Sequence, residues 1–242
     1  MIRHEQIAHG AVSLITLDRP ERRNALDAAH WSQLASLVTE AADGGARVVV
    51  ITGEGSCFCA GGDLDESAIE DMAELLEKAF TVIREVPVPV IAYINGPAVG
   101  GGAQLAVSCD LRVAGPKARF RVPAAALSLP VNPGTIDRIV ALAGTGAARA
   151  MLIGGDWISA ERAHALGLVE RVGELDDALN WASEVAGFAP LLLSYFKERL
   201  QVGNPTDRGE YSGFLRSVLE SEDHAESVNA RAENRAPRYI GR

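Results

Sequence analysis

The stretch INGPAVGGGAQLAVSCDLRVA, residues Ile94–Ala114, changes secondary structure twice within a short length of chain. It begins at the end of an apolar strand, PVIAYI (89–94), and three glycines, Gly100 to Gly102, then open a helix. A short strand, LRVA (111–114), follows that helix. Strand, helix and strand in this order are typical of a βαβ unit, so the stretch predicts a parallel sheet covered by helices.

The chain on both sides of this stretch continues the alternation. The run Val12–Leu17 predicts a strand, and Asp27 is placed to cap a helix that ends before Gly44 and Gly45. Further elements are expected at 47–52 (strand), 69–84, 134–143, 147–153 and 159–166 (helices). The predicted fold class is therefore α/β.

The pattern changes near Asp176, where strands stop. LDDALNWASEVAGFAP (175–190), PLLLSYFKERL (190–200) and the charged segment after Thr206 indicate consecutive helices. We predict a core over residues 1–188 and a helical segment over 189–242 that packs on a neighbouring subunit. No linker separates the two as independent domains.

Composition limits the function classes. A net charge of −9 and a pI near 5.1 are unsuited to nucleic-acid binding, which needs a broad cationic surface. Cys57, Cys59 and Cys109 lack the spacing of a zinc site, so they are expected to be reduced packing residues, and no metal is expected. Without a signal peptide or an apolar run that could span a membrane, a cytoplasmic location is expected.

Two glycine-rich turns, GEGSCFCAGGDL (53–64) and GPAVGGGAQL (96–105), each follow an apolar strand. Neither has the pattern of a Walker A loop or a dinucleotide-binding turn. Two backbone N–H groups that converge, one of them at a helix N-terminus, can bind the oxygen of a polarised carbonyl or enolate. The alternative is that these glycines only allow tight turns and close helix packing.

Four stretches resemble the crotonase family of enoyl-CoA hydratases and isomerases, in the family's order. They are RPERRNAL (19–26), FCAGGDL (58–64), the stretch 94–114 quoted above, and ISAERAHALGLVERV (158–172). Among members of that family, the chain most resembles short mycobacterial enoyl-CoA hydratase-like proteins that lack both catalytic glutamates.

The resemblance implies a spiral of ββα turns followed by C-terminal helices that form a homotrimer or a homohexamer. It implies that coenzyme A binds as part of a thioester ligand, with no other cofactor. It also implies that the N–H groups of Gly62 and Gly101 form the oxyanion hole. The residues that would contact coenzyme A are Arg23, Ala25, Ala60, Gly62, Asp63 and Leu64.

The chain departs from the family where hydration needs acids and bases. The two positions that carry glutamate in the family's hydratases are Gln104 and Ala124 here, and the aspartate position of isomerases matches Asn132. An amide cannot exchange a proton at neutral pH, and alanine has no proton to give. Asn132 precedes Pro133 and is also well placed to cap a helix. Asp63, Asp65, Glu66, Asp137 and His164 are the other titratable candidates, and none is a convincing replacement.

We therefore expect a protein that binds fatty acyl-CoA or enoyl-CoA, has little or no hydratase activity, and serves long-chain fatty acid metabolism. Two alternatives stay open: an active enoyl-CoA hydratase or isomerase with an unidentified acid or base, and a structural subunit of a mixed hexamer. The apolar run Ala124–Leu127 and a stripe that includes Met72, Leu75 and Leu76 could wall an acyl tail, although such a stripe is also ordinary core.

Overall fold

A six-stranded sheet forms the centre of the computed structural model, which describes residues 1–63, 69–201 and 208–242, with only the backbone given for 69–71 and 208–212. The strand order is β1-β2-β3-β4-β6-β9. All neighbours pair in parallel except β1 and β2, which are antiparallel. The strands are β1 (Ile2–Ile7), β2 (Val12–Leu17), β3 (Val48–Gly53), β4 (Val90–Ile94), β6 (Leu111–Ala114) and β9 (Arg171–Val172). The predicted α/β class is confirmed, whereas β1 was not predicted.

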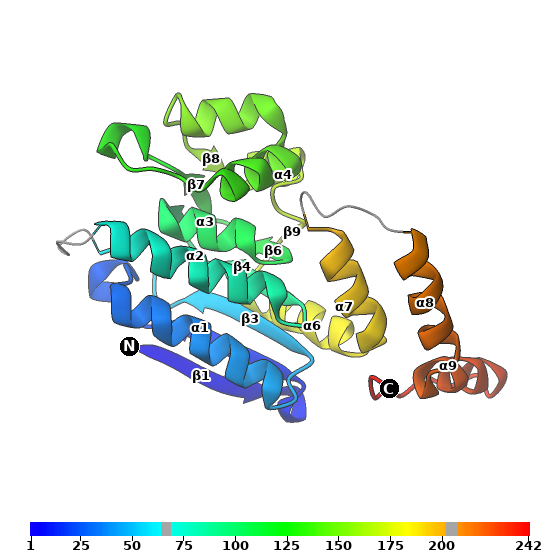
Figure 1. The fold of residues 1–242 in the computed structure, drawn as a ribbon. Coiled ribbons are helices and arrows are strands. Elements are labelled where there is room, and N and C mark those ends of the chain that lie inside the picture. The colour runs from blue at the N-terminus through cyan, green and yellow to red at the C-terminus, as the bar shows by residue number, and fades with distance from the viewer. Residues whose placement is uncertain (64–68, 202–207) are drawn as a thin grey trace.

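Both faces of the central strands are buried, because side chains that alternate along each strand enter two different cores. In β3, Val49 and Ile51 join one apolar cluster, while Val48 and Val50 join the other. The first cluster lies under α1 (Ala28–Asp43), α2 (Ile69–Glu85) and α3 (Gly101–Ser108), and the second lies under α6 (Leu175–Ala186). Figure 1 shows α1 and α2 side by side across the sheet. A sheet covered on both faces explains the continuous apolar runs of the sequence.

Local signals set the ends of these helices as expected. Asp27 accepts a hydrogen bond from the His30 N–H at the start of α1, and Gly44 ends that helix. Asn132 accepts one from the Gly134 N–H at the start of α4 (Pro133–Leu152). The backbone of α4 breaks at Gly144 (φ 78°), where the sequence predicts a division into two helices. Ser159 caps α5 (Ala160–Leu166), which stops at Gly167.

A second, smaller sheet lies above the first and was not predicted. It consists of β5 (Pro97–Val99), β7 (Arg119–Arg121) and β8 (Ile158–Ser159). Single bridges extend it from Ala98 to Cys59 and connect Gly62 to Leu26. These pairings bring together five segments that are far apart in sequence, among them both glycine-rich turns.

The C-terminal helices α7 (Pro190–Arg199), α8 (Arg208–Leu219) and α9 (Glu222–Ala232) lie at one side of the sheet (Figure 1). The tail folds back on α9 and contacts the core, since Arg47 Nη1 donates to the carbonyl oxygen of Tyr239 at 2.9 Å. No helix in the described part of the chain is long and apolar enough to cross a membrane.

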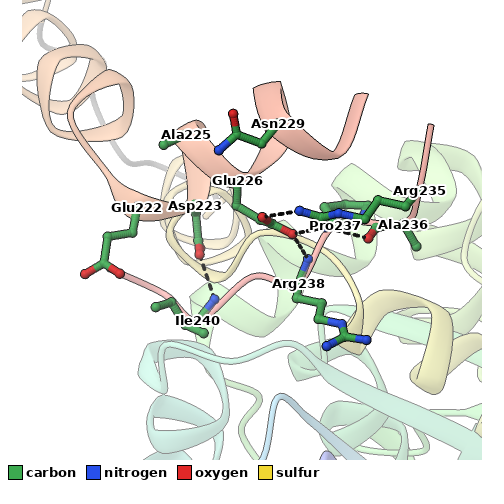
Figure 2. Close-up of a pocket in the computed structure, with 10 residues that line it drawn as sticks. All are labelled: Glu222, Asp223, Ala225, Glu226, Asn229, Arg235, Ala236, Pro237, Arg238 and Ile240. Carbon is green, nitrogen blue, oxygen red and sulfur yellow. Dashed lines mark hydrogen bonds and ion pairs between the residues drawn. The ribbon is translucent and has the colours of Figure 1, made fainter. Parts of the chain in front are cut away.

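A hollow between α9 and this tail is lined by charged groups that already bind one another (Figure 2). Asp223 accepts hydrogen bonds from the N–H groups of Ile240 and Gly241, and Glu226 accepts them from Arg235 and from the N–H of Arg238. The hydrogen bond from Arg235 lowers the pKa of the Glu226 carboxyl to about 2. These contacts explain the fold of the tail, and the hollow is not the site expected from the glycine motifs.

Candidate active site

The two glycine-rich turns are in direct contact. A Cβ atom placed on Gly61 would lie 2.9 Å from the Gly101 nitrogen, and one placed on Gly101 would lie 3.4 Å from the Gly61 Cα. Gly61 has φ of +100°, a backbone conformation that residues other than glycine rarely adopt. Two segments about forty residues apart therefore bring their backbones to one point, as the sequence predicts.

The triplet that opens α3 needs glycine for different reasons at different positions. Gly100 has φ of +54° and ψ of −117°, so its backbone conformation excludes other residues. Gly102 has an ordinary conformation, but a Cβ atom there would lie 2.1 Å from the carbonyl oxygen of Cys59. Close helix packing, the alternative explanation of the glycine-rich turns, therefore explains Gly102.

Two backbone donors remain unused at this contact. Within the described residues, no hydrogen-bond acceptor is found for the N–H of Gly62 or for the N–H of Gly101. Gly101 is the first residue of α3, so its N–H lies at the positive end of the helix dipole. The pair is suited to bind one carbonyl oxygen, because buried or half-buried donors without a partner favour an incoming acceptor.

Gln104 lies in the first turn of α3, three residues after Gly101 and thus on the same face of the helix. Its side chain is half-buried, and no residue in the described ranges forms a hydrogen bond with its amide. Its backbone N–H donates to the Gly100 oxygen. The amide is thus free to contact a ligand or water beside the oxyanion donors.

Ala124 follows β7, whose end is joined to the glycine triplet by a hydrogen bond from the Gly100 N–H to the Arg121 oxygen, 2.9 Å. Ala124 is partly buried and packs against the main apolar cluster. Its position beside the triplet carries a methyl group in place of a carboxylate.

Asn132 is exposed, and its Oδ1 accepts the Gly134 N–H at 2.7 Å. The capping role of Asn132 is confirmed. Asp137 and His164 are also exposed, on α4 and α5. Asp65 and Glu66 lie outside the described residues. None of these observations supplies a replacement acid for the site.

An apolar wall from α2 covers both oxyanion glycines. The Met72 side chain lies 3.6 Å from a Cβ position on Gly62, and Leu76 Cδ2 lies 3.0 Å from one on Gly101. Both side chains are partly buried against the main cluster, as is Leu75. Beneath Gly101, Trp31 packs edge to face on Phe80 with the ring centroids 5.6 Å apart. The stripe predicted on this helix therefore packs over Gly62 and Gly101.

The residues expected to contact coenzyme A lie around one loop. Arg23 is exposed, with φ of +54°, and its carbonyl oxygen accepts the Ala60 N–H at 3.0 Å. The Ala25 N–H donates to the Arg22 oxygen. No described residue donates to the carbonyl oxygen of Ala60, which leaves it as a free acceptor. Leu64 lies outside the described residues.

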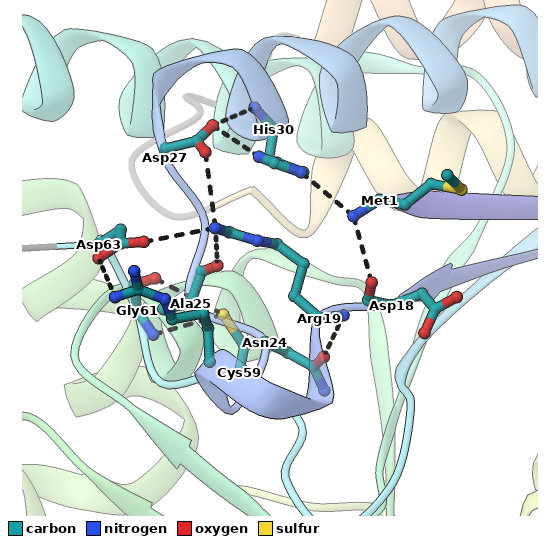
Figure 3. Close-up of polar contacts among 11 residues, drawn as sticks. Met1, Asp18, Arg19, Asn24, Ala25, Asp27, His30, Cys59, Gly61 and Asp63 are labelled. Atoms are coloured by element: carbon teal, nitrogen blue, oxygen red, sulfur yellow. Dashed lines mark hydrogen bonds and ion pairs between the residues drawn. The ribbon is translucent and has the colours of Figure 1, made fainter.

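Asp63 is not free for a ligand. Its carboxylate pairs with Arg19 at 3.5 Å (Figure 3) and with Arg22 at 3.9 Å, and its N–H donates to the Leu26 oxygen. Its position in the turn follows the prediction, but the contacts of its side chain are with the protein.

The cysteines near the turns are buried, which disfavours the reactive thiolate. Burial raises the pKa of the Cys59 thiol to about 12, and burial also raises the pKa of Cys57. All three cysteines are buried and unpaired. They are packing residues, as the sequence predicts.

Comparisons with known proteins agree with this arrangement. The model of the enoyl-CoA hydratase/isomerase family matches residues 8–242. The chain is 39% identical over 234 residues to "Probable enoyl-CoA hydratase echA6" of Mycobacterium tuberculosis, and 34% identical over 244 residues to the 2,3-dehydroadipyl-CoA hydratase of Escherichia coli. Each alignment covers 96% of this chain and 96% of the relative.

Solved structures show the same fold. A crystal structure of an enoyl-CoA hydratase/carnithine racemase from Magnetospirillum magneticum aligns with a TM-score of 0.90 at 32% identity, covering 100% of this chain and 96% of that one. An enoyl-CoA hydratase from Bacillus anthracis aligns with a TM-score of 0.91 at 30% identity, covering 100% and 99%. With its paired glycine turns in the family's positions and the likeness extending over nearly the whole chain, this protein belongs to the enoyl-CoA hydratase/isomerase family.

Proposed function

We propose that this protein binds fatty acyl-CoA or enoyl-CoA thioesters and has little or no hydratase activity. The observation that carries the proposal is the pair of unused N–H groups on Gly62 and Gly101 beside two positions that cannot exchange protons. The thioester oxygen would accept from both N–H groups, while Gln104 and Ala124 replace the acid and base that hydration needs. Coenzyme A enters as part of the ligand.

The nucleotide end of the ligand would lie along the loop that carries Arg23. That guanidinium is exposed and suits the phosphates, and the free carbonyl oxygen of Ala60 suits the adenine amino group. The acyl tail would run along Met72 and Leu76. Loss of the carboxylates favours a long hydrocarbon chain, because a buried charge beside it would carry a desolvation cost. This supports a role in long-chain fatty acid metabolism.

Calorimetry with an acyl-CoA chain-length series tests the binding half of the proposal. We expect at least a tenfold gain in affinity from butanoyl-CoA to decanoyl-CoA, since each buried CH₂ contributes about 0.8 kcal/mol. Failure to bind any acyl-CoA would contradict the proposal and favour a structural subunit of a mixed hexamer.

A hydration assay tests the second part of the proposal, that the protein has little or no hydratase activity. Loss of the conjugated thioester absorbance of crotonyl-CoA and longer 2-enoyl-CoAs measures hydration directly. A missing acid or base costs about 10²- to 10⁴-fold, whereas the oxyanion donors still contribute about 10²- to 10³-fold. We therefore expect a rate at least about 10²-fold below that of an ordinary hydratase. A rate within tenfold would instead support an active hydratase with an acid not identified here, which the names of the curated relatives favour.

Placing a carboxylate at both positions should increase hydratase activity. The double variant Gln104→Glu/Ala124→Glu is expected to hydrate crotonyl-CoA about 10²-fold faster than the wild type, because it returns a carboxyl to both positions at which the family's hydratases carry glutamate. The matched control, Gln104→Glu/Ala124→Gln, has almost the same side-chain volume but lacks the second carboxyl and should gain much less. Equal rates in both variants would show that the pocket has changed in more than its acids.

A further inference from the structure

We infer that Arg19 is a positioning residue that holds the Gly62 peptide in place for the thioester oxygen. The inference rests on the proposed function, because it concerns how that oxygen is bound. The sequence places Arg19 in the RPERRNAL stretch without a role, and only the folded structure shows what its guanidinium contacts.

Gly62 lies outside any helix, and a short backbone ladder fixes its peptide. The Leu26 N–H donates to the Gly61 oxygen at 2.9 Å, and the Asp63 N–H donates to the Leu26 oxygen at 3.0 Å. Both hydrogen bonds join the Gly62 turn to Leu26, and they flank Gly62 on either side. The direction of the Gly62 N–H therefore depends on how the segment around Leu26 is held.

Arg19 binds both segments of this ladder (Figure 3). Its Nη1 donates to the Ala25 oxygen at 2.7 Å and lies 3.6 Å from Asp27 Oδ2, so it contacts the residues on each side of Leu26. Its Nη2 lies 3.5 Å from Asp63 Oδ2, next to Gly62. One planar cation thus binds both backbone segments, around Leu26 and around Gly62, that orient the Gly62 N–H.

The backbone of Arg19 is itself anchored, which fixes the start of its side chain. The Arg19 N–H donates to Asn24 Oδ1 and the Asn24 N–H donates to the Arg19 oxygen, both at 2.9 Å. Asn24 is fully buried, and its Nδ2 donates to the carbonyl oxygens of Glu54 and Cys57. The Arg19 side chain is only 16% exposed and its guanidinium contacts three protein groups. It is therefore unsuited to bind a phosphate, in contrast to the exposed Arg23.

The surroundings of Asp27, one of the two carboxylate partners of Arg19, favour its charged form. Burial acts to raise the pKa of Asp27, but the hydrogen bonds from His30 and the charge of Arg19 outweigh it and lower that pKa below its ordinary value. Without Arg19, Asp27 and Asp63 would face each other across Leu26 with less compensation, and the two strands would separate. A donor moved by about 1 Å loses most of its effect on a bound carbonyl.

The test measures the carbonyl directly. Binding in an oxyanion hole lowers the C=O stretching frequency of a ¹³C-labelled acyl-CoA thioester, and infrared difference spectra record this shift. For Arg19→Gln we expect more than half of the wild-type shift to be lost. We also expect acyl-CoA affinity to fall roughly five- to tenfold, the loss of one hydrogen bond. Affinity for free coenzyme A, which has no thioester carbonyl, should change less than twofold. Arg19→Lys keeps the positive charge but loses the planar guanidinium with its several donors. Its carbonyl shift and acyl-CoA affinity should lie between those of the wild type and Arg19→Gln.

Arg3→Gln is the matched control, because Arg3 also pairs with carboxylates, Asp18 and Glu54, but does not contact the ladder. It should keep the full carbonyl shift. An unchanged shift in Arg19→Gln, even with a lower melting temperature, would refute the inference and leave the proposed function standing. A wild-type protein that binds no acyl-CoA would refute both. If Arg19→Gln does not fold, Asp63→Asn removes one of the two ion pairs of Arg19, and an unchanged carbonyl shift in that variant would equally refute the inference.

Discussion

Replacing Gly102 by alanine is expected to lower the free energy of unfolding by about 3 kcal/mol, which is roughly 6 to 12 °C in melting temperature for a chain of this size. The added Cβ would lie 2.1 Å from the Cys59 oxygen and 2.7 Å from the Cys59 carbonyl carbon. These are backbone atoms of the strand that leads into the Gly62 turn, so no side chain can move aside. The start of α3 must shift, and the two oxyanion donors separate.

Gly146→Ala is the control for this variant. Gly146 lies in α4, and a Cβ atom there would meet nothing within 4 Å, so alanine should be neutral or stabilise the helix by about 0.4 to 1 kcal/mol. Thermal unfolding and acyl-CoA calorimetry on both variants separate the outcomes. A Gly102→Ala protein with wild-type stability and affinity would show that the contact between α3 and the Cys59 strand is looser than the structure has it.

Lys197→Met is expected to cost about 3 kcal/mol of stability, because it removes the partner of a largely buried carboxylate. Lys197 comes from α7 and is 5% exposed, and its Nζ lies 2.8 Å from Asp110 Oδ2. The same ammonium donates to the carbonyl oxygens of Ile83 and Val88, both at 2.8 Å. Methionine fills similar volume but leaves all three acceptors without this donor.

The double variant Asp110→Asn/Lys197→Met distinguishes charge from packing. It removes the unpaired carboxylate and should recover part of the lost stability in urea unfolding.

The deficit of the single variant should also depend on pH. Burial raises the pKa of Asp110, so the folded protein binds its proton more tightly, and the stability that this proton contributes is present at low pH and lost as pH rises through the folded pKa. Lys197 favours the charged form of Asp110, so its removal raises the pKa of that carboxyl further, and the deficit of Lys197→Met should shrink as the pH falls and Asp110 takes up a proton. A deficit that is the same at every pH would contradict a role for the ion pair.

Local patterns were sufficient for the elements of the large sheet. Apolar alternation in Val12–Leu17, a cap at Asp27 and stop signals at Gly44 and Gly167 each act within a few residues, so sequence reading recovers them. The strand β1 escaped prediction because most of its side chains are polar and exposed, and it is defined by its pairing with β2. The strands β5, β7 and β8 are two or three residues long, too short for a periodic signal.

The site divides in a similar way. The glycine spacing and the family motifs indicated which turns would meet. The family motifs also showed that Gln104 and Ala124 occupy the two positions where hydratases carry glutamate. By residue type alone the three arginines of this stretch look alike, and the family resemblance singled out Arg23 but gave Arg19 no role. The fold turns Arg19 inward onto Asp27 and Asp63 and leaves Arg23 exposed with a positive φ.

The sequence by itself determined the family, the alternation of strands and helices, the oxyanion glycines as candidates, and the absence of glutamate at two positions. These are properties of residue identity and of short-range backbone preference. Only the tertiary structure decided that Gly102 is needed for the Cys59 backbone, that Arg19 ties the Gly62 turn to Leu26, and that Lys197 neutralises Asp110. Each of these depends on contacts between segments that are distant in sequence, and its energy depends on distance and burial, which the order of residues does not contain.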